Sequence, residues 1–373
     1  MELNKIKFGA IALLSLAMTS CALDEDFTKL ETNAASESNS NTSEIGFKVQ
    51  ASQLTRASGS YNNSFRPTQF EITAFDGDDN YYNGGTDLVS SSDKGKTWTS
   101  DHRRYWPTDR HDSWEGLTFF AYIDGNENSW TRGSRSTSGK FDITGAVPAI
   151  RDFEVDSDIH AQRDLMYAVA KDVKRNSNGK VNLNFRHALS QICFTAQNCN
   201  PTLDDIEILS IELGGVKGAG TYYYPEATTE GGYSVELRSA SAGRWILDRN
   251  AKDESYRLSD INMSLGAAIH NGKGDLMNIS IPTGADDECS NAMFLIPQTV
   301  DARLDRNADS GAYIKVTVRK TLKDASAPSA PEEVFIPTSV NWEEGRSYVY
   351  NINWRASAIN FSVTVSDYSD AGC

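Results

Sequence analysis

The sequence lacks the short motifs that usually mark a catalytic centre. It contains no His-Glu-x-x-His pair, no Gly-x-Ser-x-Gly elbow and no phosphate-binding loop. Histidines are few and scattered, none at ligand spacing from another on one predicted element: His102, His111, His160, His187 and His270. His187 lies in a strand-like run, where we expect a hydrogen-bonded core histidine. These absences predict a protein that is not an enzyme and holds no cofactor or metal.

Basic residues are scarce relative to acidic ones. The chain has 36 Lys and Arg against 51 Asp and Glu, a formal net charge of −15. Removing residues 1–20, as argued below, removes Glu2, Lys5 and Lys7, which leaves 34 basic and 50 acidic residues. A surface this acidic argues against nucleic acid or an anionic bilayer as a partner. It suits a soluble surface outside the cell.

Cysteines number five in 373 residues. Cys21 has a role of its own, described below, which leaves Cys193, Cys199, Cys289 and Cys373. An oxidising compartment would allow disulfides, and Cys193 and Cys199 are close enough in sequence to close a small loop. Buried thiols are an equal alternative, because pairing cannot be derived from spacing, and the spacing matches no zinc site.

The chain begins with a short apolar run after a basic start. Lys5 and Lys7 precede residues 8–18, which carry no charge and supply about half of the roughly 20 apolar residues of a membrane span. This pattern predicts a signal peptide over residues 1–20. Met18-Thr-Ser-Cys21 resembles a bacterial lipobox, with Met where Leu is usual, so we expect lipid on Cys21. The alternative is a plain secretory peptide with an incidental cysteine.

Residues 22–43 read as a polar tether that cannot build a core. The tether starts with the acidic run Asp24-Glu25-Asp26. That run resembles the surface-export tag that follows the lipid cysteine in Bacteroidetes lipoproteins. We therefore expect an outer-membrane lipoprotein at the cell surface.

The rest of the chain shows short runs in which apolar and polar residues alternate, separated by Gly, Asn, Asp and Pro. Alternation of period two predicts strands with one buried face, and no long helical period is present. The runs lie at 45–49, 70–74, 117–121, 165–169, 181–185, 206–211, 313–318, 349–354 and 359–365. Many short strands with turns between them predict an all-β chain of two tandem antiparallel β-sandwich domains.

We place the domain boundary at the polar break of residues 197–201. Residues 57–200 form the predicted N-terminal sandwich and residues 201–373 the C-terminal sandwich. Residues 21–56 comprise the lipidated tether and the first strand, together a candidate removable propeptide.

Three local patterns suggest binding sites, each with a plainer explanation. The glycines of segment 214–220 precede strand-like sequence rather than the helix that a dinucleotide site requires, so we expect a turn or bulge. The acidic segment 76–80 resembles a calcium loop, but it lacks the EF-hand glycine and glutamate, which favours a hairpin turn. Four tryptophans in one loop-rich region suggest sugar stacking, although most tryptophans in sandwiches are core residues: Trp98, Trp106, Trp114 and Trp130.

Two segments near the ends share one design. The first is Ile45-Gly-Phe47-Lys-Val49-Gln-Ala51, and the second is Ile359-Asn-Phe361-Ser-Val363-Thr-Val365. Each places a row of apolar side chains on one face of a strand. A flexible polar stretch follows the first segment and contains Arg56-Ala57, where a trypsin-like protease cuts readily.

With these features the sequence resembles the fimbrillin-like lipoproteins, the pilin family of type V pili in the Bacteroidetes. The lipid leader, the Glu44-Ile-Gly-Phe47 strand and Leu54-Thr-Arg-Ala57 carry the resemblance. So do Leu117-Thr-Phe-Phe-Ala-Tyr122, Asp164-Leu-Met-Tyr-Ala168, Val181-Asn-Leu-Asn-Phe-Arg-His-Ala-Leu-Ser-Gln-Ile192, Phe294-Leu-Ile-Pro-Gln298 and Trp342-Glu-Glu-Gly-Arg-Ser-Tyr-Val-Tyr350.

The resemblance implies transthyretin-like sandwich domains and assembly by strand exchange. In such a scheme a protease cuts after Arg56 and the first strand leaves with Ile45, Phe47 and Val49. A C-terminal strand of the next subunit, with donor candidates Ile359, Phe361, Val363 and Val365, then fills the groove. The implied partners are other pilin subunits in a head-to-tail filament, lipid through Cys21, and a host protein or glycan receptor for adhesion.

Plainer alternatives exist for both ends and for the function. The first segment could be a permanent edge strand, Arg56 an ordinary loop arginine, and the second segment the last strand of its own domain. A surface glycan-binding lipoprotein that does not polymerise is the competing hypothesis, and a hydrolase without a motif is the third.

Overall fold

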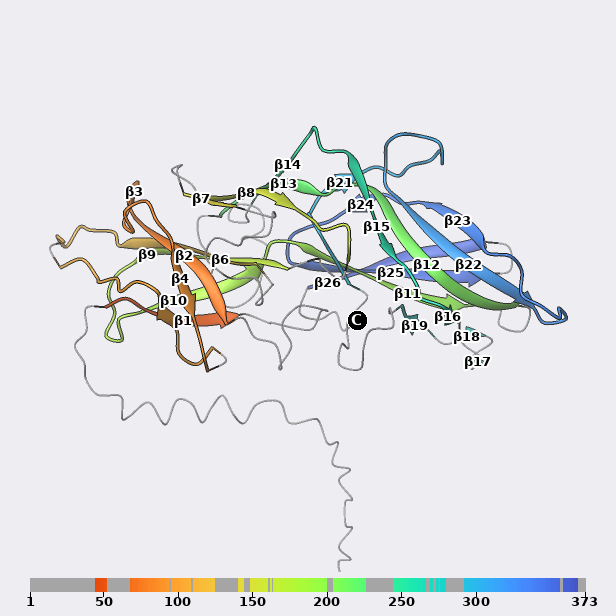
Figure 1. The fold of residues 1–373 in the computed structure, drawn as a ribbon, viewed down its shortest axis with the longest axis horizontal. Coiled ribbons are helices and arrows are strands. Elements are labelled where there is room, and N and C mark those ends of the chain that lie inside the picture. Colours follow the sequence, from red (N-terminus) through yellow and green to blue (C-terminus); the bar gives the residue numbers. More distant parts are fainter. Residues whose placement is uncertain are drawn as a thin grey trace, which may run out of the picture. The chain divides into compact units, whose positions relative to one another are not determined.

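The computed structural model describes residues 44–51, 68–93, 95–108, 110–124, 140–143, 148–159, 162, 164–199, 204–225, 244–265, 269–270, 273–274, 276–279, 292–355 and 358–367. All of them belong to the compact unit Ser43–Cys373. Within these residues every regular element is a strand, which confirms the all-β prediction (Figure 1). No helix in the described part of the chain is long and apolar enough to cross a membrane.

The largest sheet collects eight strands from the first half of the chain. Its order is β1-β10-β9-β6-β2-β4-β5, and β3 pairs with β2. The strands are β1 (Gly46–Ala51), β2 (Gln69–Asp76), β3 (Asp79–Asn80), β4 (Asp87–Ser90), β5 (Thr99–Ser100), β6 (Leu117–Asp124), β9 (Leu165–Val173) and β10 (Lys180–His187). All their pairings are antiparallel except that of β1 with β10, which is parallel.

Both faces of this sheet are covered, which explains why β2 is buried along nearly its whole length. Phe70, Ile72 and Phe119 belong to one core, together with Ile45 and Phe47. The side chains that alternate with them on β2 and β6 include Phe75, Phe120 and Tyr122, which belong to a second core on the opposite face. A strand buried on both sides carries apolar residues at consecutive positions.

A four-stranded sheet and two further sheets complete the fold. The four-stranded sheet supplies Ile150, Phe153 and Tyr222 to the second core. Its order is β14-β13-β8-β7, comprising β7 (Lys140–Asp142), β8 (Ala149–Glu154), β13 (Ala219–Tyr223) and β14 (Arg244–Leu247). Two short pairs add β17 (Ile269–His270) with β18 (Lys273–Gly274), and β21 (Thr299–Val300) with β24 (Val340–Asn341).

The two further sheets enclose the third core. One has the order β19-β11-β25-β26 with β20 on β11, and the other has the order β15-β12-β22-β23 with β16 on β12. Their inward residues alternate as predicted, for example Ile314, Val316 and Val318 on β22 and Tyr350 and Ile352 on β25. The strands are β11 (Ser190–Asn198), β12 (Asp204–Lys217), β15 (Asp253–Leu258), β16 (Met263–Ser264), β19 (Met277–Asn278), β20 (Met293–Leu295), β22 (Tyr313–Leu322), β23 (Glu332–Pro337), β25 (Arg346–Arg355) and β26 (Ala358–Asp367).

Strands from both sides of the predicted domain boundary share sheets. β11 lies before residue 200 but pairs in parallel with β25, and β8 pairs with β13. The antiparallel prediction therefore has two exceptions among the pairings between named strands of the described residues, β1–β10 and β11–β25, and the isolated bridge between Ala302 and Ala312 is also parallel. The boundary itself stays a prediction.

The glycine-rich segment 214–220 contains a β-bulge, as the sequence suggested. The register of β12 against β15 shifts between Gly214 and Val216, and Gly215 takes a φ of +77°. A Cβ on Gly215 would stand 1.9 Å from the carbonyl oxygen of Gly311. Only a residue without a side chain fits there, so the glycine serves strand packing rather than a phosphate.

Two alternatives were open for Cys193 and Cys199, a small loop closed by a disulfide or buried side chains without that bond, and the structure supports the second, because no disulfide joins these two residues. Cys193 lies inside β11, and the N–H of Cys199 still donates to the carbonyl of Trp354 beside that strand (2.8 Å). Six residues of extended strand span about 20 Å. A disulfide needs Cα atoms within about 7 Å. Both side chains are buried.

Candidate functional site at the first and last strands

β1 is an edge strand whose apolar side chains enter a core. Ile45 and Phe47 are buried, and Val49 packs against the same cluster. The ring of Phe47 meets Phe70 edge to face with centroids 5.8 Å apart. Lys48, between the apolar positions, is exposed. β1 thus fills a furrow in the sheet, with Lys48 outward.

The backbone of segment 44–51, which comprises β1 and the two residues before it, has neighbours on both sides. On one side it follows β10 in parallel, with Phe47 opposite Val181 and Val49 opposite Leu183 (Figure 1). On the other side Glu44 forms an antiparallel bridge with Tyr105. Parallel ladders are slightly less stable per residue than antiparallel ones. The first strand is therefore held by the weaker of the two ladder types.

β26 is the edge strand of a different sheet and pairs antiparallel with β25. Phe361 stacks on Tyr350 with ring centroids 5.4 Å apart and packs against the third core. Val363 and Val365 lie on the same face of the strand, yet they remain 41% and 54% exposed. The apolar row of β26 is therefore only partly covered by its own subunit.

Several predicted site residues fall outside the described residues. These are the lipidation residue Cys21 and the cleavage residues Arg56 and Ala57. The backbone of Ile359 pairs opposite Trp354, but its side chain is also outside the description. Their roles stay predictions.

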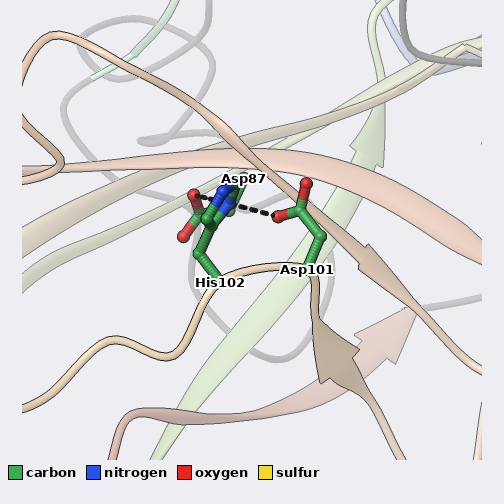
Figure 2. Close-up of side chains that lie close together, drawn as sticks. All are labelled: Asp87, Asp101 and His102. Atoms are coloured by element: carbon green, nitrogen blue, oxygen red, sulfur yellow. Dashed lines mark hydrogen bonds and ion pairs between the residues drawn. The ribbon is translucent and has the colours of Figure 1, made fainter.

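One group of side chains has the composition of a metal site. Figure 2 shows the His102 side chain in contact with Asp87 and Asp101, with Nδ1 3.2 Å from Asp87 Oδ1 and 2.9 Å from Asp101 Oδ1. Asp87 is buried, and Arg104 donates from Nε and Nη2 to its two carboxylate oxygens at 2.8 Å each. Because a guanidinium already occupies Asp87, the group fits an ion-pair network rather than a cation site.

The tryptophans of the loop-rich region contribute to packing. Trp106 is buried in the first core, and Trp98 and Trp114 pack against it. Trp106 donates from Nε1 to the carbonyl of Gly179 (3.2 Å), and Trp114 donates to Asp76 (2.8 Å). Trp106 is only 2% exposed and cannot stack on a sugar, whereas Trp98 and Trp114 are partly buried. Trp130 lies outside the described residues.

The acidic segment 76–80 is a hairpin turn rather than a calcium loop. Asp76 pairs with Asp79, and Gly77 supplies the positive φ of +61° that the tight turn requires. Asp76 binds Arg110 and Trp114, while Asn80 accepts from the N–H groups of Tyr82 and Gly84. The predicted core role of His187 is also confirmed, because it is buried with Nδ1 2.6 Å from Asp164.

No sequence pattern indicates that segment 104–106 lies beside Glu44 and Ile45. The residues Arg-Tyr-Trp before Pro107 show no alternation of period two and lie in a loop. The N–H of Ile45 nevertheless donates to the carbonyl of Arg104 (2.8 Å). Only the three-dimensional pairing reveals this contact.

A family model described as fimbrillin-like matches residues 55–367. The chain belongs to the fimbrillin-like family. This match spans the large sheet from β2 onward and the complete β26 strand. The fimbrillin-like family is a family of fimbrial structural proteins. No curated protein matches the chain.

Three solved structures of bacterial proteins are similar to this chain. A fimbrial protein from Bacteroides vulgatus has 16% identity and a TM-score of 0.56, with 87% of this chain and 99% of that chain covered. A putative cell adhesion protein from Bacteroides uniformis has 14% identity and a TM-score of 0.43, covering 87% and 99%. The tip fimbrial protein of Porphyromonas gingivalis has 10% identity and a TM-score of 0.37, with the same coverage. The first of these shows the shared fold.

Proposed function

We propose that this fimbrillin-like chain is a structural subunit of a type V surface fimbria that assembles by protease-triggered strand exchange and supports adhesion. It is delivered as a lipoprotein through Cys21. Membership of a family of fimbrial proteins supports the subunit role. The exchange step is argued from the first and last strands.

The observation that carries the proposal is a shared pattern in β1 and β26. Residues 45–49, which run from the residue before β1 into the strand, and residues 359–363 of β26 both read Ile-x-Phe-x-Val, with Phe47 in one and Phe361 in the other. In β1 the pattern is buried in a core, whereas in β26 Val363 and Val365 are largely exposed. A strand that leaves its own valines in solvent can gain burial in a furrow shaped for the same side chains.

The pattern also defines the register of the exchange. With Phe361 in the place of Phe47, Ile359 replaces Ile45 and Val363 replaces Val49, parallel to β10. Asn360 then takes the place of Gly46, where an added Cβ would lie 3.2 Å from Cγ of Lys180. The long side chain of Lys180 can move by a few tenths of an ångström, so this register fits.

Cleavage after Arg56 supplies the driving force. It separates β1 from the sheet covalently, so that the segment is held by its ladder, by the backbone contacts of Glu44 and Ile45 with segment 104–106, and by three apolar side chains. Burial of three such side chains is worth roughly 4–9 kcal/mol, and a vacated furrow exposes that surface together with an open backbone edge. A donor strand from the next subunit restores both. Because this head-to-tail contact is not closed by symmetry, it produces a filament.

The test uses the purified chain from residue 22 onward, treated with an arginine-specific protease. We expect a new N-terminus at Ala57 by mass spectrometry and filaments by light scattering and electron microscopy. Arg56→Gln should remain monomeric under the same treatment, whereas Arg66→Gln, a matched change ten residues on, should assemble normally. Filaments that retain residues 22–56, or a cleaved protein that stays monomeric, would contradict strand exchange.

A further inference from the structure

Segment 104–106 lies beside Glu44 and Ile45, the two residues that lead into β1, on the side opposite β10. Tyr105 bridges Glu44, and the carbonyl of Arg104 accepts the N–H of Ile45 at 2.8 Å. The residues that lead into β1 therefore lie in a slot with two backbone walls, segment 104–106 on one side and the start of β10 on the other. An edge strand in an ordinary sheet has a single wall.

This second wall is anchored without the help of β1. The Arg104 guanidinium binds both carboxylate oxygens of Asp87 on β4, at 2.8 Å each, and Asp87 is 1% exposed. The same guanidinium lies 4.5 Å from the ring centroid of Tyr82, a cation–π contact. Burial raises the pKa of Tyr82, so the ring beneath the guanidinium is neutral.

Two further contacts fix the residues that follow. The hydroxyl of Tyr81 donates to the carbonyl of Tyr105 (2.7 Å). Trp106 is buried, with its ring centroid 6.1 Å from that of Phe119, and its Nε1 donates to the carbonyl of Gly179. That carbonyl also accepts the N–H of Gly46 (3.0 Å). Because Gly179 directly precedes β10, the Trp106 hydrogen bond connects the second wall to the start of the first wall, β10. All these anchors remain when β1 leaves.

We propose that segment 104–106 is the preformed second wall of the groove that receives β26 of a second copy of this chain, and that Arg104 positions it. This inference rests on the proposed strand exchange. In the Ile-x-Phe-x-Val register, the N–H of Ile359 from the incoming copy takes the place of the Ile45 N–H on the Arg104 carbonyl. A groove that keeps its shape spares the incoming strand the cost of reordering the acceptor.

The experiment uses the full chain cleaved after Arg56 and two fluorescent peptides, residues 44–51 and residues 358–367. Binding is followed by anisotropy, and the unfolding midpoint of each uncleaved variant is measured separately. Arg104→Gln removes the two hydrogen bonds from the guanidinium to the Asp87 carboxylate. Arg104→Lys keeps a charge but loses the paired geometry. Arg103→Gln is the matched control, because the Arg103 side chain is 77% exposed and reaches Glu44 only at 4.0 Å.

We expect Arg104→Gln to lower the affinity for both peptides by about tenfold or more. The affinity of Arg104→Lys should lie between that of Arg104→Gln and that of the parent, and Arg103→Gln should bind both peptides as tightly as the parent does. A folded Arg104→Gln variant that binds both peptides as tightly as the parent would overturn the inference. The parent could bind the peptide of residues 44–51 in an Arg104-dependent manner but fail to bind the peptide of residues 358–367. In that case β26 is not the donor strand, and the role of segment 104–106 as a wall of the groove is retained. If the parent binds neither peptide, both proposals fail.

Discussion

Phe47 lies edge to face against Phe70, with ring centroids 5.8 Å apart, and this contact ties the first strand to the core of the large sheet. Phe47→Ala should therefore destabilise the uncleaved chain by about 3 kcal/mol, the low end for buried Phe because β1 is an edge strand. Urea unfolding followed by tryptophan fluorescence measures the change.

Lys48→Ala provides the control for that substitution, because Lys48 is the exposed neighbour on the same strand. Its effect should stay within about 0.5 kcal/mol. Equal losses for both variants would mean that the Phe47 side chain adds nothing to the stability of the sheet.

The exposed valines of β26 should matter for assembly more than for folding. Val363→Thr and Val365→Thr together preserve shape but add hydroxyl groups, and the monomer should lose no more than about 0.5 kcal/mol per site. Filament formation after cleavage should fall sharply, as monitored by light scattering. Ser362→Ala on the opposite face is the control and should assemble normally. Unimpaired assembly of the double threonine variant would argue against β26 as the donor.

Gly215 and Gly84 form a matched pair for separating backbone strain from crowding. Their φ angles are +77° and +78°, but an added Cβ meets the Gly311 carbonyl at Gly215 and nothing within 4 Å at Gly84. Gly84→Ala should lower the free energy of unfolding by about 1 kcal/mol, because only the backbone strain at a positive φ contributes there. Gly215→Ala should cost clearly more, because β12 and segment 311–312 must separate. Thermal unfolding of both variants tests this, and equal costs would show that the bulge relaxes freely.

Tyr313 predicts a loss of stability at high pH. Burial, followed by its hydrogen bond to Glu212, raises its pKa to about 12 from an ordinary value of 10. The folded state then keeps a proton that the unfolded state releases, so this stabilisation is complete below pH 10 and disappears as the pH rises through about 12. Tyr313→Phe should flatten the fall in unfolding free energy between pH 10 and 12. An identical slope in the variant would contradict the assignment.

Alternating runs were the part of the fold that the sequence predicted well. Residues 181–185 and 313–318 alternate because one face of each strand packs on a core and the other does not. The hairpin at 76–80 and the bulge at Gly215 were also predictable, since both rest on local turn chemistry. Strands buried on both faces, such as β11, lack this period and are harder to predict.

The pairing of strands that are far apart in the chain could not be predicted from the sequence. Nothing in the local pattern of residues 46–51 specifies β10 as a parallel partner, or Tyr105 as the neighbour on the other side. The anchoring of Arg104 on Asp87 joins residues 17 positions apart through a loop without periodicity. The similarity of the Ile-x-Phe-x-Val segments was visible in the sequence, but their difference in burial was not.

The parallel pairing of β1 with β10 also orders events in time. Gly46 pairs with Lys180, so the ladder of β1 cannot form until well over a hundred further residues have been synthesised. Such long loop closures are slow compared with the neighbouring hairpins β2–β4 and β4–β5, which form from adjacent segments. The nascent sheet thus waits with an open edge, and the chain carries at its beginning the strand that this sheet receives last.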